Sequence, residues 1–201
     1  GLFTLSDVER ITQESQAQFK PARDHHFQLL CGAAIPTSRT ESGNLDRERI
    51  INHIGALVDR GMDVAAVSTA HGHTIGVGET VSMIRDAFED LPIIAGNVTS
   101  GTGVEFLADA GADSIKVGQG PGSICTTRIV TGVGIPQLTA VQDAYSVAKK
   151  YNIPVISDGG MRYSGDIAKS LAAGASCVML GSLFAGTDES PGEVILWEGR
   201  S

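Results

Sequence analysis

The stretch "PVISDGGMRYSGDIAKSLAAGASCVMLGS" (154–182) contains the repeating unit that decides the fold. It opens with a Val- and Ile-rich apolar run, "PVISDGG" (154–160), and closes with a second run, "CVMLGS" (177–182). Between them "SGDIAKSLAAG" is amphipathic, with Ser164 as a candidate N-cap and Gly174 placed to end a helix. Nearly continuous apolar runs of this kind are typical of parallel strands covered on both faces. The stretch therefore predicts a strand, a helix and a second strand.

The same alternation extends through the rest of the chain. Amphipathic helical patterns separate the apolar runs, and the pattern at 46–61 has one apolar stripe that Gly61 is placed to end. Six strands alternating with helices mean an α/β fold, either a barrel or an open doubly wound sheet. The other four predicted strands are 29–35, 64–70, 92–98 and 114–118, and the stripe comprises Ile50, Ile51, Ile54, Leu57 and Val58.

The ends of the predicted strands favour the barrel. Strand after strand runs into a short polar or Gly-rich segment, and in a barrel these ends converge on one mouth where the site is built. An open sheet would concentrate its chemistry at one switch point instead. We therefore predict a TIM (β/α)8 barrel of which this chain of 201 residues holds about six of the eight units, since ~250 residues are typical of the whole. The segments are Ser68–Thr69, Gly96–Asn97, Gly118–Ser123, Asp158–Gly160 and Gly181–Ser182.

The composition narrows the class of protein. Hydrophobic residues make up 42% and charged residues 19% of the chain, as in ordinary globular proteins. The net charge of −8 argues against a nucleic-acid partner, and no apolar run approaches the ~20 residues of a membrane helix. The 3 cysteines are widely separated, which predicts free thiols in a reducing cytoplasm and no disulfide framework or zinc cluster.

The loop "GQGPGSICTT" (118–127) is the strongest candidate for chemistry. Its glycines alternate, which does not match G-x-G-x-x-G, and the residues after it do not predict a helix, so a dinucleotide fingerprint is rejected. Alternate glycines bare a backbone whose N–H groups can receive a phosphate and whose carbonyls can ligate a hard cation. Cys125 is either a small buried apolar residue or a nucleophile, and Lys116 and Arg128 are its charged neighbours in sequence.

Three other motifs have a functional and a purely structural interpretation. In "SDGG", Asp158 can accept hydrogen bonds from a ribose diol, or it can cap a turn. Ser182 in "LGS" can hold a phosphate or merely end a strand. In "STAHGHT", His71 and His73 have the spacing of metal ligands but no clear third partner, so we favour a polar loop. The adjacent pair His25 and His26 is expected to face solvent.

The longer motifs resemble a known family. The segments "GNVTSGTGVEFLADAGADSIKVGQGPGSICTTRIVTGVGIPQLTAV", "SDGGMRYSGDIAKSLAAGASCVMLGSLFAGTDESPGE" and "STAHGHT" closely resemble the inosine-5′-monophosphate (IMP) dehydrogenases, and the GMP reductases share much of the pattern. The opening "GLFTLSDVERITQ" reads as a strand and a helix capped by Ser6 or Asp7, and "GLFTLSDVER" resembles the end of the CBS regulatory module of this family. The expected divisions are a CBS tail at 1–14, a connecting loop at 15–28 and a partial catalytic barrel at 29–201.

The resemblance implies a reaction. Cys125 would attack C2 of IMP, hydride would pass to NAD, and a covalent thioimidate would be hydrolysed to XMP, with Thr127 beside the water. The alternatives are a GMP reductase, which converts GMP and NADPH to IMP and ammonia, and a non-catalytic nucleotide-binding relative. The family also implies a homotetramer that uses potassium. The barrel strands that the family places before its CBS module and the flap that carries its general base are not in this sequence, so we expect a segment that is not a competent catalyst alone.

The resemblance also implies binding residues at matched positions. The family has an aspartate that binds the NAD ribose where this chain has Ser68, which predicts weaker or altered cofactor binding. The implied residues are Ser123, Asp158, Gly159, Gly160, Gly181 and Ser182 for IMP; Ser68, Asn97, Gly118, Gln119 and Gly120 for NAD; and the carbonyls of Gly120, Gly122 and Cys125 for potassium.

Overall fold

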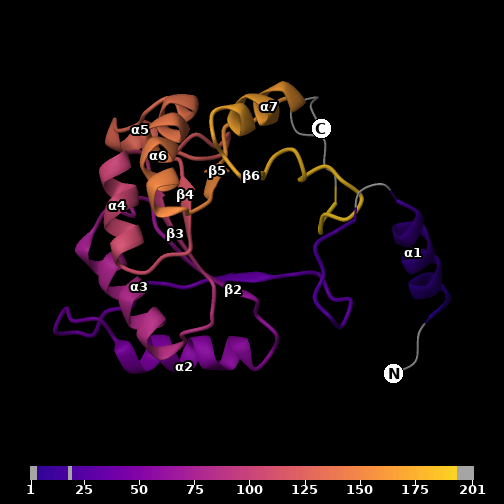
Figure 1. Ribbon diagram of the computed structural model, residues 1–201, viewed down its shortest axis with the longest axis horizontal. Coiled ribbons are helices and arrows are strands. Elements are labelled where there is room, and N and C mark those ends of the chain that lie inside the picture. Colours follow the sequence, from indigo (N-terminus) through magenta and orange to yellow (C-terminus); the bar gives the residue numbers. More distant parts are fainter. Residues whose placement is uncertain (1–3, 18–19, 194–201) are drawn as a thin grey trace.

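The computed structural model describes residues 4–17 and 20–193, and its centre is one six-stranded parallel sheet (Figure 1). The strands follow chain order from β1 to β6, and each pairs in parallel with the next. All six predicted strands are confirmed, although each is shorter than its apolar run. The strands are β1 (Gly32–Ala34), β2 (Val64–Ser68), β3 (Ile93–Val98), β4 (Ser114–Val117), β5 (Val155–Asp158) and β6 (Cys177–Met179).

The helices lie outside the curled sheet, so the chain forms a half-barrel. A doubly wound sheet reverses its strand order at a switch point, whereas here every connection adds a strand on the same side. In Figure 1 the helices α2, α3, α4, α6 and α7 surround the sheet, and α1 stands apart from this layer. The helices are α1 (Leu5–Gln16), α2 (Arg47–Val58), α3 (Ile75–Ala87), α4 (Gly101–Asp109), α5 (Thr127–Thr131), α6 (Gln137–Tyr151) and α7 (Ser164–Ala172).

The core fills the space between the strands and the helices. Ile54 of α2, Ile84 of α3 and Leu107 of α4 are fully buried against strand residues such as Ile93 and Ile115. Two members of the predicted stripe of α2, Ile50 and Ile54, are buried, Ile51 and Leu57 are half-buried, and Val58 is exposed. The helical layer therefore supplies the outer cover that parallel strands require.

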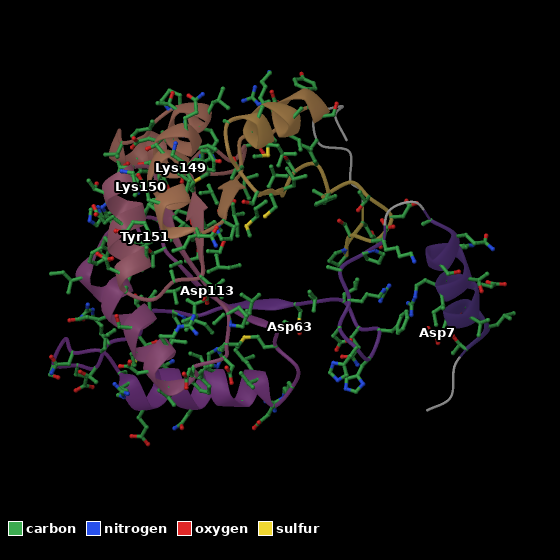
Figure 2. The ribbon with its side chains drawn as sticks, in the orientation of Figure 1. Asp7, Asp63, Asp113, Lys149, Lys150 and Tyr151 are labelled. Atoms are coloured by element: carbon green, nitrogen blue, oxygen red, sulfur yellow. The ribbon has the colours of Figure 1, made fainter. Side chains whose placement is uncertain are left out.

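Two aspartates, Asp63 and Asp113, form hydrogen bonds at the amino ends of the strands (Figure 2). Asp63 precedes β2 and accepts a 2.7 Å hydrogen bond from the backbone N–H of Cys31. Asp113 precedes β4 and accepts a 2.7 Å hydrogen bond from the N–H of Ile93, while it also pairs with Arg85. Each carboxylate thus links its own strand to the start of the neighbouring one.

Three local expectations are wrong. Helix α1 begins at Leu5 and is capped by Thr4, not by Ser6 or Asp7, because Thr4 Oγ1 accepts a hydrogen bond from the N–H of Asp7 at 3.2 Å. The strand expected before this helix falls on residues 1–3, which lie outside the described residues. Helix α7 begins at Ser164 itself, so Tyr163 occupies the N-cap position. The short helix α5 follows the cysteine loop where none was expected, and Gly132 ends it in the left-handed region. Five residues are too few for an apolar period to reveal a helix.

Within the residues that the structure describes, no helix is long and apolar enough to cross a membrane.

Candidate active site

Two adjoining pockets open at the carboxyl ends of the strands. One has a volume of about 320 Å³ and lies between the cysteine loop, the end of β5 and the segment after β6. The other has a volume of about 370 Å³ and lies between the ends of β2, β3 and β4 and the cysteine loop. They share Pro121, Gly122, Asp158 and Gly159 as lining residues. We call them the β5–β6 pocket and the β2–β4 pocket.

The structure places every residue that the resemblance singled out in the wall of one or both pockets. Residues from five strand ends are thus brought together, as the barrel prediction requires. The β5–β6 pocket is lined by Gly122, Ser123, Asp158, Gly159, Gly160, Gly181 and Ser182, and the β2–β4 pocket by Ser68, Asn97, Gly118, Gln119, Gly120, Gly122, Cys125, Thr127, Asp158 and Gly159.

Cys125 lies half-exposed in the β2–β4 pocket, in a tight turn of its loop. Its backbone N–H donates to the carbonyl of Gly122 at 3.1 Å, and its Sγ lies 3.2 Å from Oγ1 of Thr127. Hydrogen bonds from the Thr127 hydroxyl and backbone lower the pKa of the Cys125 thiol, and the charge of Arg128 adds to this effect. By contrast, burial raises the pKa of Cys177, and all three cysteines are free. Cys125 is therefore more readily ionised than Cys177, and the thiolate is the form that acts as a nucleophile.

Two glycines allow the backbone of the loop to come close to its neighbours. Gly118 has φ of +138°, and a Cβ there would lie 2.6 Å from the carbonyl oxygen of Asp158. Gly120 has φ of +65°, and a Cβ there would lie 2.9 Å from Cγ of Arg128. Both side-chain clash and backbone conformation therefore select glycine at these positions.

Arg128 and Gln119 hold the loop in shape from behind. Nε of Arg128 donates to the carbonyl of Gln119 at 2.8 Å, and its terminal nitrogen donates to the carbonyl of Ile135 at 2.7 Å. Nε2 of Gln119 lies 2.6 Å from Nδ1 of His71. His73 instead contacts the ring of Phe106. Among the described residues no cluster of three His, Cys, Asp or Glu side chains could hold a metal.

Sequence reasoning gave no role in the site to two residues beneath it. Lys116 of β4 pairs with Asp158, and Asp158 also accepts a 2.9 Å hydrogen bond from Nδ2 of Asn97. Nε2 of Gln137 donates to the carbonyl of Val117 at 2.8 Å and so fixes the end of β4. Lys116 could have been singled out because it is a lysine inside an apolar strand, whereas no local pattern marks Gln137.

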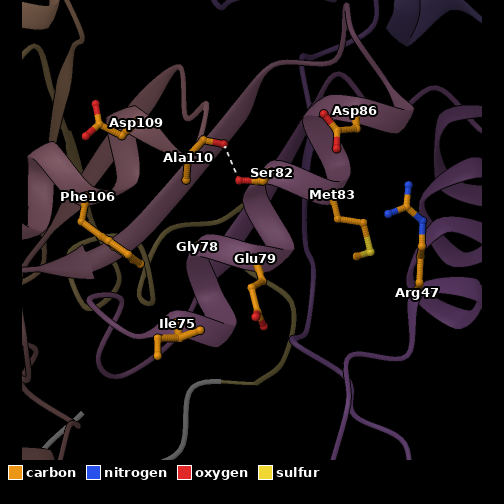
Figure 3. A pocket seen from close by; sticks show the side chains of 10 residues that line it. All are labelled: Arg47, Ile75, Gly78, Glu79, Ser82, Met83, Asp86, Phe106, Asp109 and Ala110. Atoms are coloured by element: carbon orange, nitrogen blue, oxygen red, sulfur yellow. Dashed lines mark hydrogen bonds between the residues drawn. The ribbon is translucent and has the colours of Figure 1, made fainter.

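A further groove of about 510 Å³ lies away from the strand ends, on the helical layer (Figure 3). Figure 3 shows Phe106 and Ile75 at this groove, with the carboxylates of Glu79, Asp86 and Asp109 around it. Catalytic groups of a barrel come from the ends of its strands, so this groove is not the candidate active site.

Comparisons with known proteins show the family of the chain. The sequence profile described as the IMP dehydrogenase / GMP reductase domain matches residues 4–201. The chain is 50% identical over its whole length to the inosine-5′-monophosphate dehydrogenase of Aquifex aeolicus, 51% to that of Pasteurella multocida and 48% to that of Escherichia coli. It spans only 38–39% of the length of these relatives. The chain belongs to the IMP dehydrogenase / GMP reductase family.

Proposed function

We propose that the protein oxidises IMP to XMP with NAD, through a covalent intermediate on Cys125. The observation that carries this proposal is the position of a thiol with a lowered pKa beside two pockets that share Asp158 and Gly159. One pocket can hold the nucleotide while the other presents the cofactor, with the reacting carbon between them. The names of the similar proteins favour the dehydrogenase over the reductase.

The reaction divides into two steps at Cys125. The thiolate forms a C–S bond to C2 of the purine, and the hydrogen on C2 leaves as hydride. Water then adds to C2, the C–S bond breaks, and XMP and the free thiolate are released with one proton. A nucleophile of this kind replaces one difficult substitution by two easier steps. The proposed role of Thr127 is to orient the attacking water, and its Oγ1 lies 3.2 Å from Sγ.

The β5–β6 pocket fits the nucleotide part of IMP. Ser123 and Ser182 are exposed hydroxyls in its wall, and Gly181 lies beside Ser182, so the three can hold the phosphate. The proposed role of Asp158, which lines this pocket, is to accept hydrogen bonds from the ribose hydroxyls. Gly159 and Gly160 have φ of +79° and +82°, and glycine there leaves backbone within reach of ribose and phosphate.

The β2–β4 pocket fits a flat polar ring such as nicotinamide. Its wall includes the Ser68 hydroxyl, the Asn97 amide and the backbone of 118–120. NAD, when bound, accepts the hydride. Because Ser68 carries no charge, recognition of the cofactor ribose is expected to be weaker than with a carboxylate at this position.

A potassium ion fits the donor chemistry of the cysteine loop. Carbonyl oxygens are the ligands that hard cations prefer, and those of Gly120, Gly122 and Cys125 are the proposed set. The Gly122 carbonyl accepts the N–H of Cys125 and keeps a second lone pair. We propose in addition a cytoplasmic homotetramer and retain the CBS tail at 1–14, the connecting loop at 15–28 and the catalytic barrel at 29–201 as predictions.

Product analysis tests the reaction. The full-length protein is incubated with IMP and NAD, and XMP and NADH are measured by chromatography and absorbance. Equal amounts of XMP and NADH are expected, and Cys125→Ser should abolish both. Consumption of GMP and NADPH, with no XMP formed from IMP, would establish the reductase instead.

Covalent labelling tests the nucleophile separately. The 6-chloropurine ribonucleotide is an electrophile that forms a C–S bond to a thiolate and releases chloride. We expect a single mass adduct on Cys125 that excess IMP prevents and that Cys125→Ser removes. Absence of the adduct in folded protein that binds IMP would favour a non-catalytic nucleotide-binding relative.

A further inference from the structure

A buried ion pair lies directly beneath the two pockets. The Lys116 side chain is 9% exposed and that of Asp158 is 22% exposed, and Nζ of Lys116 contacts Oδ2 of Asp158. A buried ammonium group is costly unless it is paired, so its presence inside an apolar strand calls for a compensating gain. A purely structural position would be filled as well by an apolar side chain.

The structure of β3 makes room for this lysine. Gly96 is the register partner of Lys116 across the β3–β4 pair. A Cβ on Gly96 would lie 2.5 Å from the carbonyl oxygen of Lys116 and 2.9 Å from its Cβ. The neighbouring strand therefore lacks a side chain at the position where the lysine enters the barrel interior.

The hydrogen bonds of Asp158 are divided unequally between its two oxygens. Oδ2 contacts Lys116 Nζ and accepts from Asn97 Nδ2 at 2.9 Å, and Asn97 Nδ2 also donates to the carbonyl of Gly118 at 2.7 Å. Within the described residues, Oδ1 of Asp158 accepts no hydrogen bond. Asp158 lines both pockets, so its free acceptor belongs to the candidate site.

We propose that Lys116 is a positioning residue that acts through Asp158. It anchors Oδ2, so that the carboxylate keeps one orientation and presents Oδ1 to the vicinal hydroxyls of the nucleotide ribose. This inference rests on the proposed function, because it assigns Asp158 to the ribose.

The proposal is tested by comparing the affinity of the protein for a nucleotide with the ribose diol and for one without it. Binding of IMP and of 2′,3′-dideoxy-IMP to the full-length protein is measured by calorimetry. The wild-type protein is expected to prefer IMP by about 10- to 100-fold, as for hydrogen bonds to a charged acceptor. Lys116→Met should reduce this preference to less than about threefold, with a much smaller change for the dideoxy nucleotide. Lys116→Arg, which keeps the charge, should retain most of it.

The matched control is Lys169→Met. Lys169 forms an exposed pair with Asp166 on α7, at 3.2 Å, and its side chain is 66% exposed. Its loss is expected to leave both affinities unchanged. If Lys116→Met weakens IMP and the dideoxy nucleotide equally, Lys116 merely supports the pocket and the proposal is wrong.

A double variant covers the case in which Lys116→Met does not fold. Lys116→Met with Asp158→Asn removes both charges and leaves no buried ion unpaired. Its preference for IMP over the dideoxy nucleotide should equal that of Asp158→Asn alone, because the lysine acts only through the carboxylate. A further loss of IMP affinity in the double variant would overturn the proposal.

If the wild-type protein does not bind IMP, the proposed function fails. If it binds IMP with a preference for the diol and Lys116→Met keeps that preference, only this inference fails.

Discussion

At the scale of single residues, the environment of Cys125 separates its thiol from that of Cys177. Thr127 and Arg128 both favour its thiolate, whereas Cys177 has its pKa raised by burial. The difference arises from the turn in which Cys125 lies, because that turn brings the Thr127 hydroxyl to Sγ. Reactivity is therefore a property of the local fold as much as of the residue type.

The first prediction concerns the pH dependence of this thiol. In a Cys31→Ser/Cys177→Ser background, the rate of alkylation of Cys125 by iodoacetamide should rise with pH. The pH at the midpoint of this rise should be lower than in the same chain unfolded in urea. Thr127→Val removes a donor to the thiolate, so the charged form is less favoured and the midpoint moves up; at neutral pH the rate should fall severalfold. Identical profiles with and without the Thr127→Val substitution would show that Thr127 does not tune the thiol.

The second prediction concerns Ser68 at the end of β2. Its Oγ lies 3.4 Å from Oδ1 of Asn97, in the wall of the β2–β4 pocket. Ser68→Asp should lower the KM for NAD about tenfold in steady-state assays of the full-length protein, because a carboxylate makes stronger hydrogen bonds to a ribose diol. The uncharged isostere Ser68→Asn is the control and should give no such gain. An unchanged or higher KM for NAD in Ser68→Asp would count against a cofactor ribose at this wall.

The sequence motifs were sufficient to predict which residues gather at the strand ends, but not how they contact one another. Cys125 remained ambiguous because its pKa depends on a hydroxyl two residues away whose direction only the turn determines. The role of Lys116 could not be inferred, since its partner Asp158 lies 42 positions along the chain. Contacts of this kind carry no local period or spacing.

At the scale of helices and strands, two glycines that follow helices differ in their surroundings. Gly61 after α2 has φ of +89°, and a Cβ there would have nothing within 4 Å, so only its backbone conformation selects glycine. Gly174 after α7 has φ of +113°, and a Cβ would lie 2.2 Å from Cγ of Tyr145. Both positions were expected to end helices, but only the structure distinguishes them.

The third prediction uses this pair. Gly61→Ala should lower the free energy of unfolding by about 1 kcal/mol, the cost of a left-handed alanine. Gly174→Ala should cost about 3 kcal/mol or more, because overpacking against the Tyr145 ring adds to the same strain. Urea denaturation followed by circular dichroism measures both. Equal losses in the two variants would mean that the contact of α7 with α6 is looser than the structure has it.

The same scale explains which boundaries were predictable. Most strands were recognised because their apolar runs are nearly continuous, and several are rich in Val and Ile, as in "PIIAGNV" (92–98). Helix starts were less accurate, since Thr4 rather than Ser6 or Asp7 caps α1, and Ser164 lies inside α7. A cap depends on where the backbone first turns, and several neighbouring polar residues can fill that position.

At the scale of the whole molecule, the sequence predicted a partial barrel because successive strands end in short polar or Gly-rich segments. The sequential order β1 to β6 and the outer position of the helices agree with that prediction. The degree of curling could not be inferred, because it depends on the register and twist of each pair, which local patterns do not encode. The half-barrel leaves β1 and β6 paired on one side only among the described residues.

These two edges lead to the last prediction. Leu29 and Leu30 precede β1 and are 59% and 51% exposed, and Phe184 follows β6 and is 57% exposed. Open strand edges beside exposed apolar side chains are templates for pairing with another chain. The 201 residues expressed alone should therefore self-associate with rising concentration in sedimentation velocity and bind a hydrophobic dye. Leu30→Lys with Phe184→Lys should reduce both signals, because charge at an edge opposes pairing. A monomer at every concentration, with no dye bound, would mean that the chain covers these edges by itself.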